Sequence, residues 1–222
     1  MLLVRDSMTR EVVTVGPETT APEALALCRD MRSCHLPVVE DGLLIGVISD
    51  RDLRSAAPAL GEPDWTKALE SIRATDEIVR EIATARADDP VERAAREMYE
   101  RKVGCLPVTD GDDLMGIVAS SDVMEAYLQL LGAHEPGRRV EVALSGRPGA
   151  FAGVAGIFQN RGVDIVSVLV SLTSELDQTE LRESIAVFRP DTINPQEVVE
   201  DLRSAGYRVL WPPAPGEDAG RM

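Results

Sequence analysis

The chain has 222 residues, of which 44% are hydrophobic and only 4% aromatic, so it can form one or two cores built on aliphatic packing. Its formal net charge of -15 and the lack of a basic run argue against nucleic acid as a partner. No apolar stretch reaches the roughly 18 residues that a membrane-spanning helix needs, and the N-terminus has no leader pattern. We therefore expect a cytoplasmic protein without a membrane partner.

The cysteines give no sign of a disulfide framework or a metal site. There are three, Cys28, Cys34 and Cys105, and no pair has the C-x-x-C spacing of a zinc ligand set. An odd number of separated cysteines is typical of reduced, partly buried thiols in a reducing compartment. We expect no bound metal.

A duplicated pattern organises the first two thirds of the chain. The letters LPVV at 36–39 recur as LPVT at 106–109, and GVISDRDL at 46–53 recurs as GIVASSDV at 116–123. Both repeats fall 70 residues later. Such self-similarity predicts two copies of one supersecondary unit.

Helical and strand signals take the same order in both copies. Residues 21–28 and 91–98 each carry one apolar stripe at helical spacing. Two aliphatic runs follow, separated in the first copy by the turn-forming residues 40–42, which predicts a hairpin. Each copy is therefore predicted to be strand, helix, strand, strand, helix. Neither copy alone can cover its sheet face, so the two should pack together.

The clearest candidate site is the spacing Gly-x-x-Ser-x-x-Asp at Gly46, Ser49 and Asp52. At the junction of a strand and a helix, the Ser49 hydroxyl and free backbone amides can bind phosphate, and the Asp52 carboxylate can accept hydrogen bonds from ribose hydroxyls. The same two residues are also the pattern of a helix capping box, which needs no ligand. Spacing alone leaves both interpretations open.

Taken together, the two copies of LPVV and GVIS-x-x-D over about residues 1–130, preceded by VVTVGP at 12–17, resemble a pair of CBS domains, also called a Bateman module. The resemblance implies clefts between the repeats that take adenine nucleotides or S-adenosylmethionine. It places Ser49 and Asp52 on phosphate and ribose, and Arg51 near phosphate. The residues that it assigns to the first cleft are Val13, Thr14, Cys34, His35, Pro37, Ser49, Arg51 and Asp52.

The second copy departs from this pattern. Ala119 stands where a serine or threonine is expected, although Asp122 remains and Ser120 or Ser121 offers a hydroxyl nearby. The resemblance assigns a second, weaker cleft to Ala83, Thr84, Cys105, Pro107, Ser121 and Asp122. His35 can equally be a structural residue without a ligand.

The last third carries the pattern of a second domain. Strands are expected at 140–144, 163–172, 184–188 and 207–211, with helices at about 150–161 and from 196 to 205. The order βαββαβ is that of a ferredoxin-like sandwich.

This part resembles an ACT domain. Its turn at 146–149 lies where that family has its ligand loop, so Arg147 and Gly149 are candidate ligand contacts, although a structural turn explains them equally well. The predicted class is α+β, with two βαββα CBS repeats at 1–65 and 66–132, an ACT-like βαββαβ domain at 138–212, and a disordered tail at 213–222.

The whole order, together with RDLRSAAPAL at 51–60 and VDIVSVLV at 163–170, resembles the acetoin utilisation proteins of AcuB type. The expected function is a non-catalytic, homodimeric regulator that senses an adenine nucleotide or S-adenosylmethionine, requires no cofactor and acts on an unidentified partner enzyme. Two alternatives are a ligand-free interaction module and a magnesium sensor. An enzyme is disfavoured because no P-loop, GxSxG or HExxH motif is present.

Overall fold

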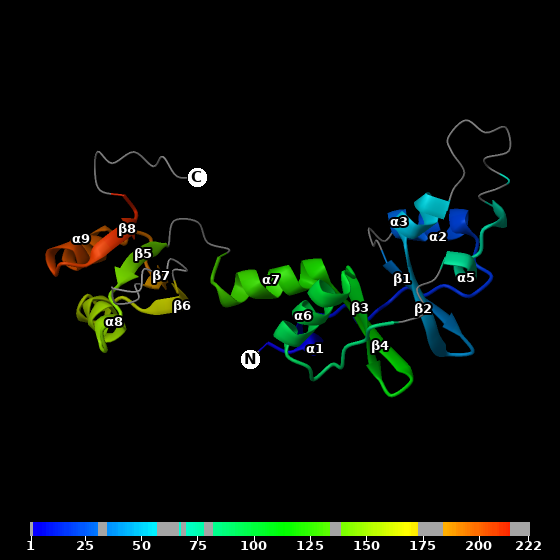
Figure 1. The fold of residues 1–222 in the computed structure, drawn as a ribbon, viewed down its shortest axis with the longest axis horizontal. Helices are drawn as coiled ribbons and strands as arrows, with labels where there is room; N and C mark the ends of the chain where they lie inside the picture. The colour runs from blue at the N-terminus through cyan, green and yellow to red at the C-terminus, as the bar shows by residue number, and fades with distance from the viewer. Residues whose placement is uncertain are drawn as a thin grey trace, which may run out of the picture. The chain divides into compact units, whose positions relative to one another are not determined.

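The computed structural model describes residues 2–30, 35–56, 67, 70–77, 82–133, 139–172 and 184–213. Contacts group the chain into two compact units, Met1–Ala126 and Tyr127–Met222. The first contains the two repeats up to Ala126, and the second contains the last residues of the second repeat and the C-terminal domain (Figure 1). The predicted α+β class is confirmed.

The first repeat contains helix α2 (Ala21–Asp30), strands β1 (His35–Glu40) and β2 (Leu43–Ser49), and helix α3 (Asp50–Ala56). The strands form an antiparallel hairpin whose two-residue turn has positive φ at Asp41 (51°) and Gly42 (85°). An Asp-Gly pair tolerates these angles at low cost, which is why the hairpin closes at this point.

The second repeat follows the same plan. It contains α6 (Val91–Arg101), β3 (Cys105–Asp110), β4 (Asp113–Ala119) and α7 (Ser120–Leu130). The registers correspond, with Leu36 opposite Ile48 in one hairpin and Leu106 opposite Val118 in the other. All four of these side chains are buried, so the duplicated apolar pattern builds two equivalent cores.

The first strand that the sequence predicts in each copy is reduced to a single parallel bridge. Val15 pairs with Val38, and Ala85 pairs with Val108. In the first copy the Val15 amide donates to the Pro37 carbonyl at 3.0 Å and the Val15 carbonyl accepts from Val39 at 2.9 Å. The entry segment therefore joins the sheet through one residue only.

The N-terminal arm of the chain attaches to the second repeat. Helix α1 (Val4–Ser7) lies beside the start of α6, where the Val4 amide donates to Asp89 and the Val91 amide donates to Leu2 (Figure 1). Thr9 then exchanges two hydrogen bonds with Ile117 of β4, both 2.9 Å. The Val4 side chain is fully buried. The chain thus crosses the second repeat before it enters the first.

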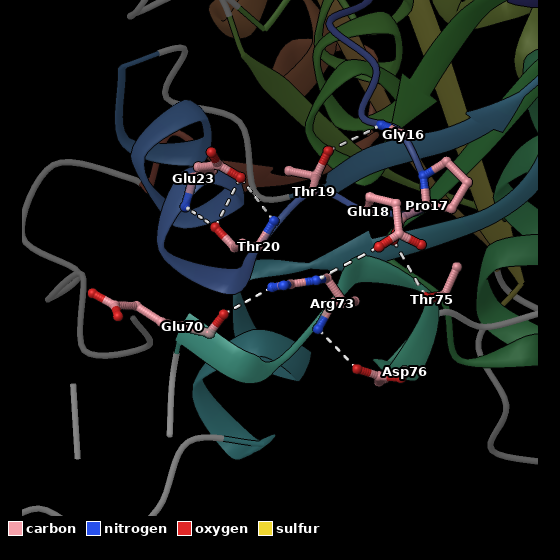
Figure 2. A network of polar contacts seen from close by, with 10 residues as sticks. All are labelled: Gly16, Pro17, Glu18, Thr19, Thr20, Glu23, Glu70, Arg73, Thr75 and Asp76. Atoms are coloured by element: carbon pink, nitrogen blue, oxygen red, sulfur yellow. Dashed lines mark hydrogen bonds and ion pairs between the residues drawn. The ribbon is translucent and has the colours of Figure 1, made fainter. Parts of the chain in front are cut away.

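The segment that precedes the second repeat in sequence attaches to the first repeat. Helix α5 (Ala74–Glu77) attaches to the first repeat, because the Ala74 amide donates to Thr19 at 2.8 Å and Thr75 donates to Pro17 (Figure 2). Ala74 is buried in the core formed by α2, β1, β2 and α3. The two repeats therefore exchange arms, and each core needs residues from the sequence of the other.

The C-terminal unit contains β5 (Val140–Leu144), α8 (Ala150–Asn160), β6 (Ile165–Leu172), β7 (Ser184–Pro190), α9 (Gln196–Ser204) and β8 (Arg208–Trp211). The strands form one antiparallel sheet in the order β6-β7-β5-β8. This is the predicted ferredoxin-like βαββαβ arrangement.

Both helices of this unit cover one face of the sheet. Phe158 of α8 stacks on Phe188 of β7, with ring centroids 5.3 Å apart, and Leu202 of α9 is buried in the same cluster. At the edge of the sheet, β6 exposes about half of the Val166, Leu169 and Val170 side chains.

Candidate functional site

Ser49 and Asp52 form a reciprocal set of hydrogen bonds where β2 passes into α3. The Ser49 hydroxyl donates to Oδ2 of Asp52 at 2.6 Å, and the Ser49 amide donates to the same oxygen at 3.0 Å. In return the Asp52 amide donates to the Ser49 hydroxyl at 3.2 Å. This is a capping box, and it holds the carboxylate in a fixed direction. No described residue donates a hydrogen bond to the other carboxylate oxygen, Oδ1.

The second copy keeps half of this arrangement. The Ala119 amide donates to Oδ2 of Asp122 at 2.8 Å, as the Ser49 amide does to Asp52. Because Ala119 has no hydroxyl, Asp122 loses the second donor that Asp52 has.

A cleft of about 180 Å³ lies against the first capping box. We call it the Ser49 cleft. It draws on both repeats and is lined by His35, Val47, Ser49, Arg51, Asp52, Ile82, Ala83, Lys102, Val103, Gly104, Cys105 and Pro107. The Arg51 side chain is exposed, and it has no hydrogen bond or ion pair with any described residue.

A second cleft of about 470 Å³ lies against Asp122. We call it the Asp122 cleft. Its lining also comes from both repeats and consists of Thr9, Glu11, Val12, Val13, His35, Leu36, Gly104, Cys105, Ile117, Ala119, Ser120, Ser121 and Asp122.

The structure distributes the sequence-predicted residues differently from the expected partition. The sequence-based prediction places Val13 in the same cleft as Ser49 and Asp52, but in the structure Val13 lines the Asp122 cleft. Conversely, it places Ala83 and Pro107 in the same cleft as Asp122, but in the structure they line the Ser49 cleft. The exchange of arms explains Val13, because the chain runs along β4 at Thr9 before it reaches its own repeat.

Three of the expected residues that the structure describes line neither cleft. Thr14 and Thr84 are exposed and line other surface hollows. Pro37 is buried, and its carbonyl accepts the amide of Val15. Cys34 lies outside the described residues.

Three residues, His35, Gly104 and Cys105, line both clefts. A Cβ atom at Gly104 would lie 2.8 Å from Cε1 of the His35 ring, so the glycine makes room for the imidazole. Burial lowers the pKa of His35, while the carboxylates of Asp50 and Asp52 act to raise it and Arg51 acts to lower it. At neutral pH the ring is therefore uncharged.

The thiol in this shared wall is inert. Burial raises the pKa of Cys105 to about 12, so the side chain stays protonated and behaves as a small apolar group. Both clefts consequently share a neutral wall, and their charge comes from the residues around it.

The sequence interpretation missed Lys102 and Gly104, which follow α6, and Glu11 in the N-terminal arm. Gly104 could have been found from the 70-residue offset, since it is the counterpart of Cys34. Lys102 adopts a left-handed conformation, φ 58°, at the end of α6, and its ammonium lies 3.9 Å from the centre of the Tyr99 ring. No sequence pattern predicts that turn.

The candidate loop of the C-terminal unit is an exposed turn. Gly149 is the N-cap of α8 with φ 87°, and the Arg147 carbonyl accepts the Ala150 amide at 3.3 Å. The glycine is explained by its backbone conformation, which other residues rarely adopt.

Within the described residues, no three potential ligands among histidine, cysteine, aspartate and glutamate come together in a way that could hold a metal ion. A search of the same residues for a helix with the length and apolar character to span a bilayer finds none.

The duplicated hairpins, the two clefts and the C-terminal sandwich agree with two family models. The CBS domain model matches residues 4–59 and 74–129, and the ACT domain model matches residues 138–206. The chain belongs to the CBS-domain family and carries a C-terminal ACT domain. The predicted resemblance to tandem CBS and ACT domains is therefore confirmed.

Individual relatives resemble mainly the CBS pair. The CBS domain-containing protein YhcV of Bacillus subtilis (strain 168) is 32% identical over 123 residues, which are 55% of this chain and 84% of YhcV. A protein of Vibrio cholerae named as an acetoin utilization protein (AcuB) is 29% identical with a TM-score of 0.50, over 61% of this chain and 99% of the other.

A third neighbour was solved with ligands. The CBS domain pair of protein MJ0100, in complex with 5′-methylthioadenosine and S-adenosyl-L-methionine, is 25% identical with a TM-score of 0.50, over 61% of this chain and 99% of the other. Curated enzymes also match, among them archaeal homoserine O-acetyltransferases, but the chain spans only 23% of their length.

Proposed function

We propose that this protein is a non-catalytic regulator whose CBS pair binds an adenosine compound and whose bound state alters contact with a partner enzyme. The ligand is an adenine nucleotide or S-adenosylmethionine, and acetoin utilisation is the pathway that the AcuB resemblance favours. The observation that carries the proposal is the fixed direction of Asp52 at a cleft between the repeats.

The geometry of this cleft suits a ribose. The capping box uses Oδ2 of Asp52 and leaves Oδ1 without a donor among the described residues, so that oxygen can accept a hydroxyl of a bound sugar. Arg51, which has no ion pair there, can meet a phosphate. The two ligands solved in MJ0100, 5′-methylthioadenosine and S-adenosyl-L-methionine, support the adenosine class for this chain.

We also propose that the protein is a homodimer. Strand β6 is an edge of the ACT sheet, and Val166, Leu169 and Val170 leave about half of their surface exposed along it. An apolar edge strand favours pairing with another chain, because both the unpaired backbone groups and the side chains are then buried. Analytical ultracentrifugation tests this, with Leu169→Lys expected to shift the equilibrium towards the monomer.

The site is tested with Asp52→Asn in the full chain, titrated calorimetrically with AMP and with S-adenosylmethionine. We expect at least one compound to bind the parent protein and to bind the variant roughly tenfold more weakly, because a hydrogen bond to a charged group is lost. Asp76→Asn is the matched control. Asp76 makes the same contact to an amide three residues earlier, that of Arg73 at 2.8 Å, but it does not line either cleft (Figure 2). Equal affinities for the parent and Asp52→Asn would refute the site.

A ligand-free interaction module is the second candidate, and the capping box itself favours it. Ser49 and Asp52 satisfy one another, so their presence needs no ligand. If neither compound binds and melting curves stay flat in the presence of AMP, ADP, ATP and S-adenosylmethionine, this second function is the correct one.

A further inference from the structure

At one pair of equivalent positions each residue lines its own cleft and the two residues differ in charge. Arg51 lines the Ser49 cleft, and Ser121, 70 residues later, lines the Asp122 cleft. Both side chains are exposed in the first turn of the helix that follows a hairpin, α3 or α7. The backbone therefore presents a cation to one cleft and a hydroxyl to the other.

Other charged residues of the clefts do not make this distinction. Lys102 lines the Ser49 cleft, but the offset pairs it in sequence with Arg32, another cation. Glu11 lines the Asp122 cleft and is paired with Glu81, another carboxylate. In sequence the charge signs agree at both pairs. Asp50 also differs from its counterpart Ser120, but Asp50 does not line the Ser49 cleft and pairs with Arg54 at 3.6 Å. Arg51 and Ser121 are therefore the pair of lining residues whose charges differ.

A second difference acts in the same direction. The Ser49 hydroxyl donates to the Asp52 carboxylate, whereas Ala119 offers no hydroxyl to Asp122. A phosphate monoester carries between one and two negative charges near neutral pH. In the Asp122 cleft it would face the carboxylates of Asp122 and Glu11, and Ser121 offers it a hydroxyl in place of the guanidinium of Arg51. In the Ser49 cleft the guanidinium of Arg51 can form charge-assisted hydrogen bonds to it.

We propose that the two clefts take different classes of adenosine compound: the Ser49 cleft takes a phosphorylated nucleotide, and the Asp122 cleft takes a phosphate-free compound that is uncharged or carries a cationic group. This partition rests on the proposed binding of adenosine compounds. Like-charge repulsion in the Asp122 cleft and the cation in the Ser49 cleft produce the selectivity, since the shared wall of His35, Gly104 and Cys105 is common to both.

The test is calorimetric titration of the full chain with AMP and with 5′-methylthioadenosine, each alone and after saturation with the other. We expect one equivalent of each compound and no competition between them. Arg51→Ser is expected to weaken the affinity for AMP roughly tenfold or more and to leave the affinity for 5′-methylthioadenosine unchanged. The reason is that the substitution removes one charge-assisted contact from one cleft only. Ser121→Arg is expected to raise the stoichiometry of AMP binding from one to two molecules per chain.

Arg54→Ser is the matched control. Arg54 is an exposed arginine of the same helix, one turn further on, and pairs with Asp50 at 3.6 Å without lining either cleft. It should leave both affinities unchanged. Two equivalents of AMP in the parent protein, displacement of 5′-methylthioadenosine by AMP, or an unaltered AMP affinity in Arg51→Ser would each overturn the partition while leaving the proposed function intact. If neither compound binds, the proposed function fails, and the partition fails with it.

Discussion

His35 stands where the two clefts meet, and its surroundings make it sensitive to pH. The ring lies against Gly104 at a distance that would not admit a Cβ atom, and it lines both clefts. Burial is the main cause of its lowered pKa, and the carboxylates of Asp50 and Asp52 only partly offset it. A proton on this ring therefore costs more in the folded protein than in the unfolded chain.

This gives a pH dependence of stability with a definite sign. Because the folded-state pKa of His35 lies below the unfolded value of about 6.5, the unfolded chain binds more protons as the pH falls through that value. Acidification from pH 7.5 to 5.5 should therefore lower the free energy of unfolding, measured by urea denaturation, more in the parent protein than in His35→Gln. An equal decrease in the free energy of unfolding in both proteins would show that His35 does not contribute to the pH dependence of stability.

Ser49 and Asp52 show what the sequence can and cannot specify at this scale. Their spacing predicts a contact between them, and the structure has that contact, in the form of a capping box. Spacing cannot tell a cap from a ligand site, since both need the same two groups at the same junction. Only the cleft beside them, built from residues of both repeats, adds information that a single segment lacks.

At the scale of elements, the exchange of arms ties the two repeats together. Val4 is fully buried beside the second repeat, although it precedes the first in sequence. Val4→Ala removes two methyl groups from that core and should lower the free energy of unfolding by about 2 kcal/mol. Urea denaturation measures this, with Leu43→Ala, at a side chain 51% exposed in the parent, as a control expected to change little.

Hydrogen exchange locates the effect of the same substitution. The amide of Val91 donates to Leu2, so it should exchange faster in Val4→Ala, while the amide of Ala24 in α2, which donates to Thr20, should not. If protection is instead lost in α2, the N-terminal arm stabilises the first repeat. That result would contradict the exchange of arms between the two repeats.

The sequence predicts the hairpins well but not the arms. The hairpins follow from local signals, namely alternating aliphatic residues around Asp41 and Gly42, and the 70-residue offset repeats the pattern. The arm helices α1 and α5 have four residues each, too few for a helical period to appear. Nothing in VRDS or ATDE indicates which core receives Val4 or Ala74. For the same reason the sequence does not indicate that Val13 lines the Asp122 cleft.

At the scale of the whole molecule, the two units have separate cores. The ACT cluster is formed by residues between Val140 and Val209, and the cluster of the first repeat by residues between Val13 and Ala74. No residue is shared between these clusters, so each unit has the means to unfold as a cooperative whole. Ligand in the CBS clefts should then stabilise one unit and not the other.

The two tryptophans allow this to be measured. Trp211 belongs to β8 of the ACT unit, while Trp65 lies outside the described residues, and Trp65→Phe leaves Trp211 as the single reporter. With AMP at about 100 times its dissociation constant, the CBS unit should gain about 2.7 kcal/mol, seen as a shift of part of the thermal transition in far-ultraviolet circular dichroism. Trp211 fluorescence should melt at an unchanged temperature, because the core of the ACT unit shares no residue with the core of the first repeat. A common shift of both signals would mean that binding in the clefts stabilises the ACT core as well, and that the two units unfold together.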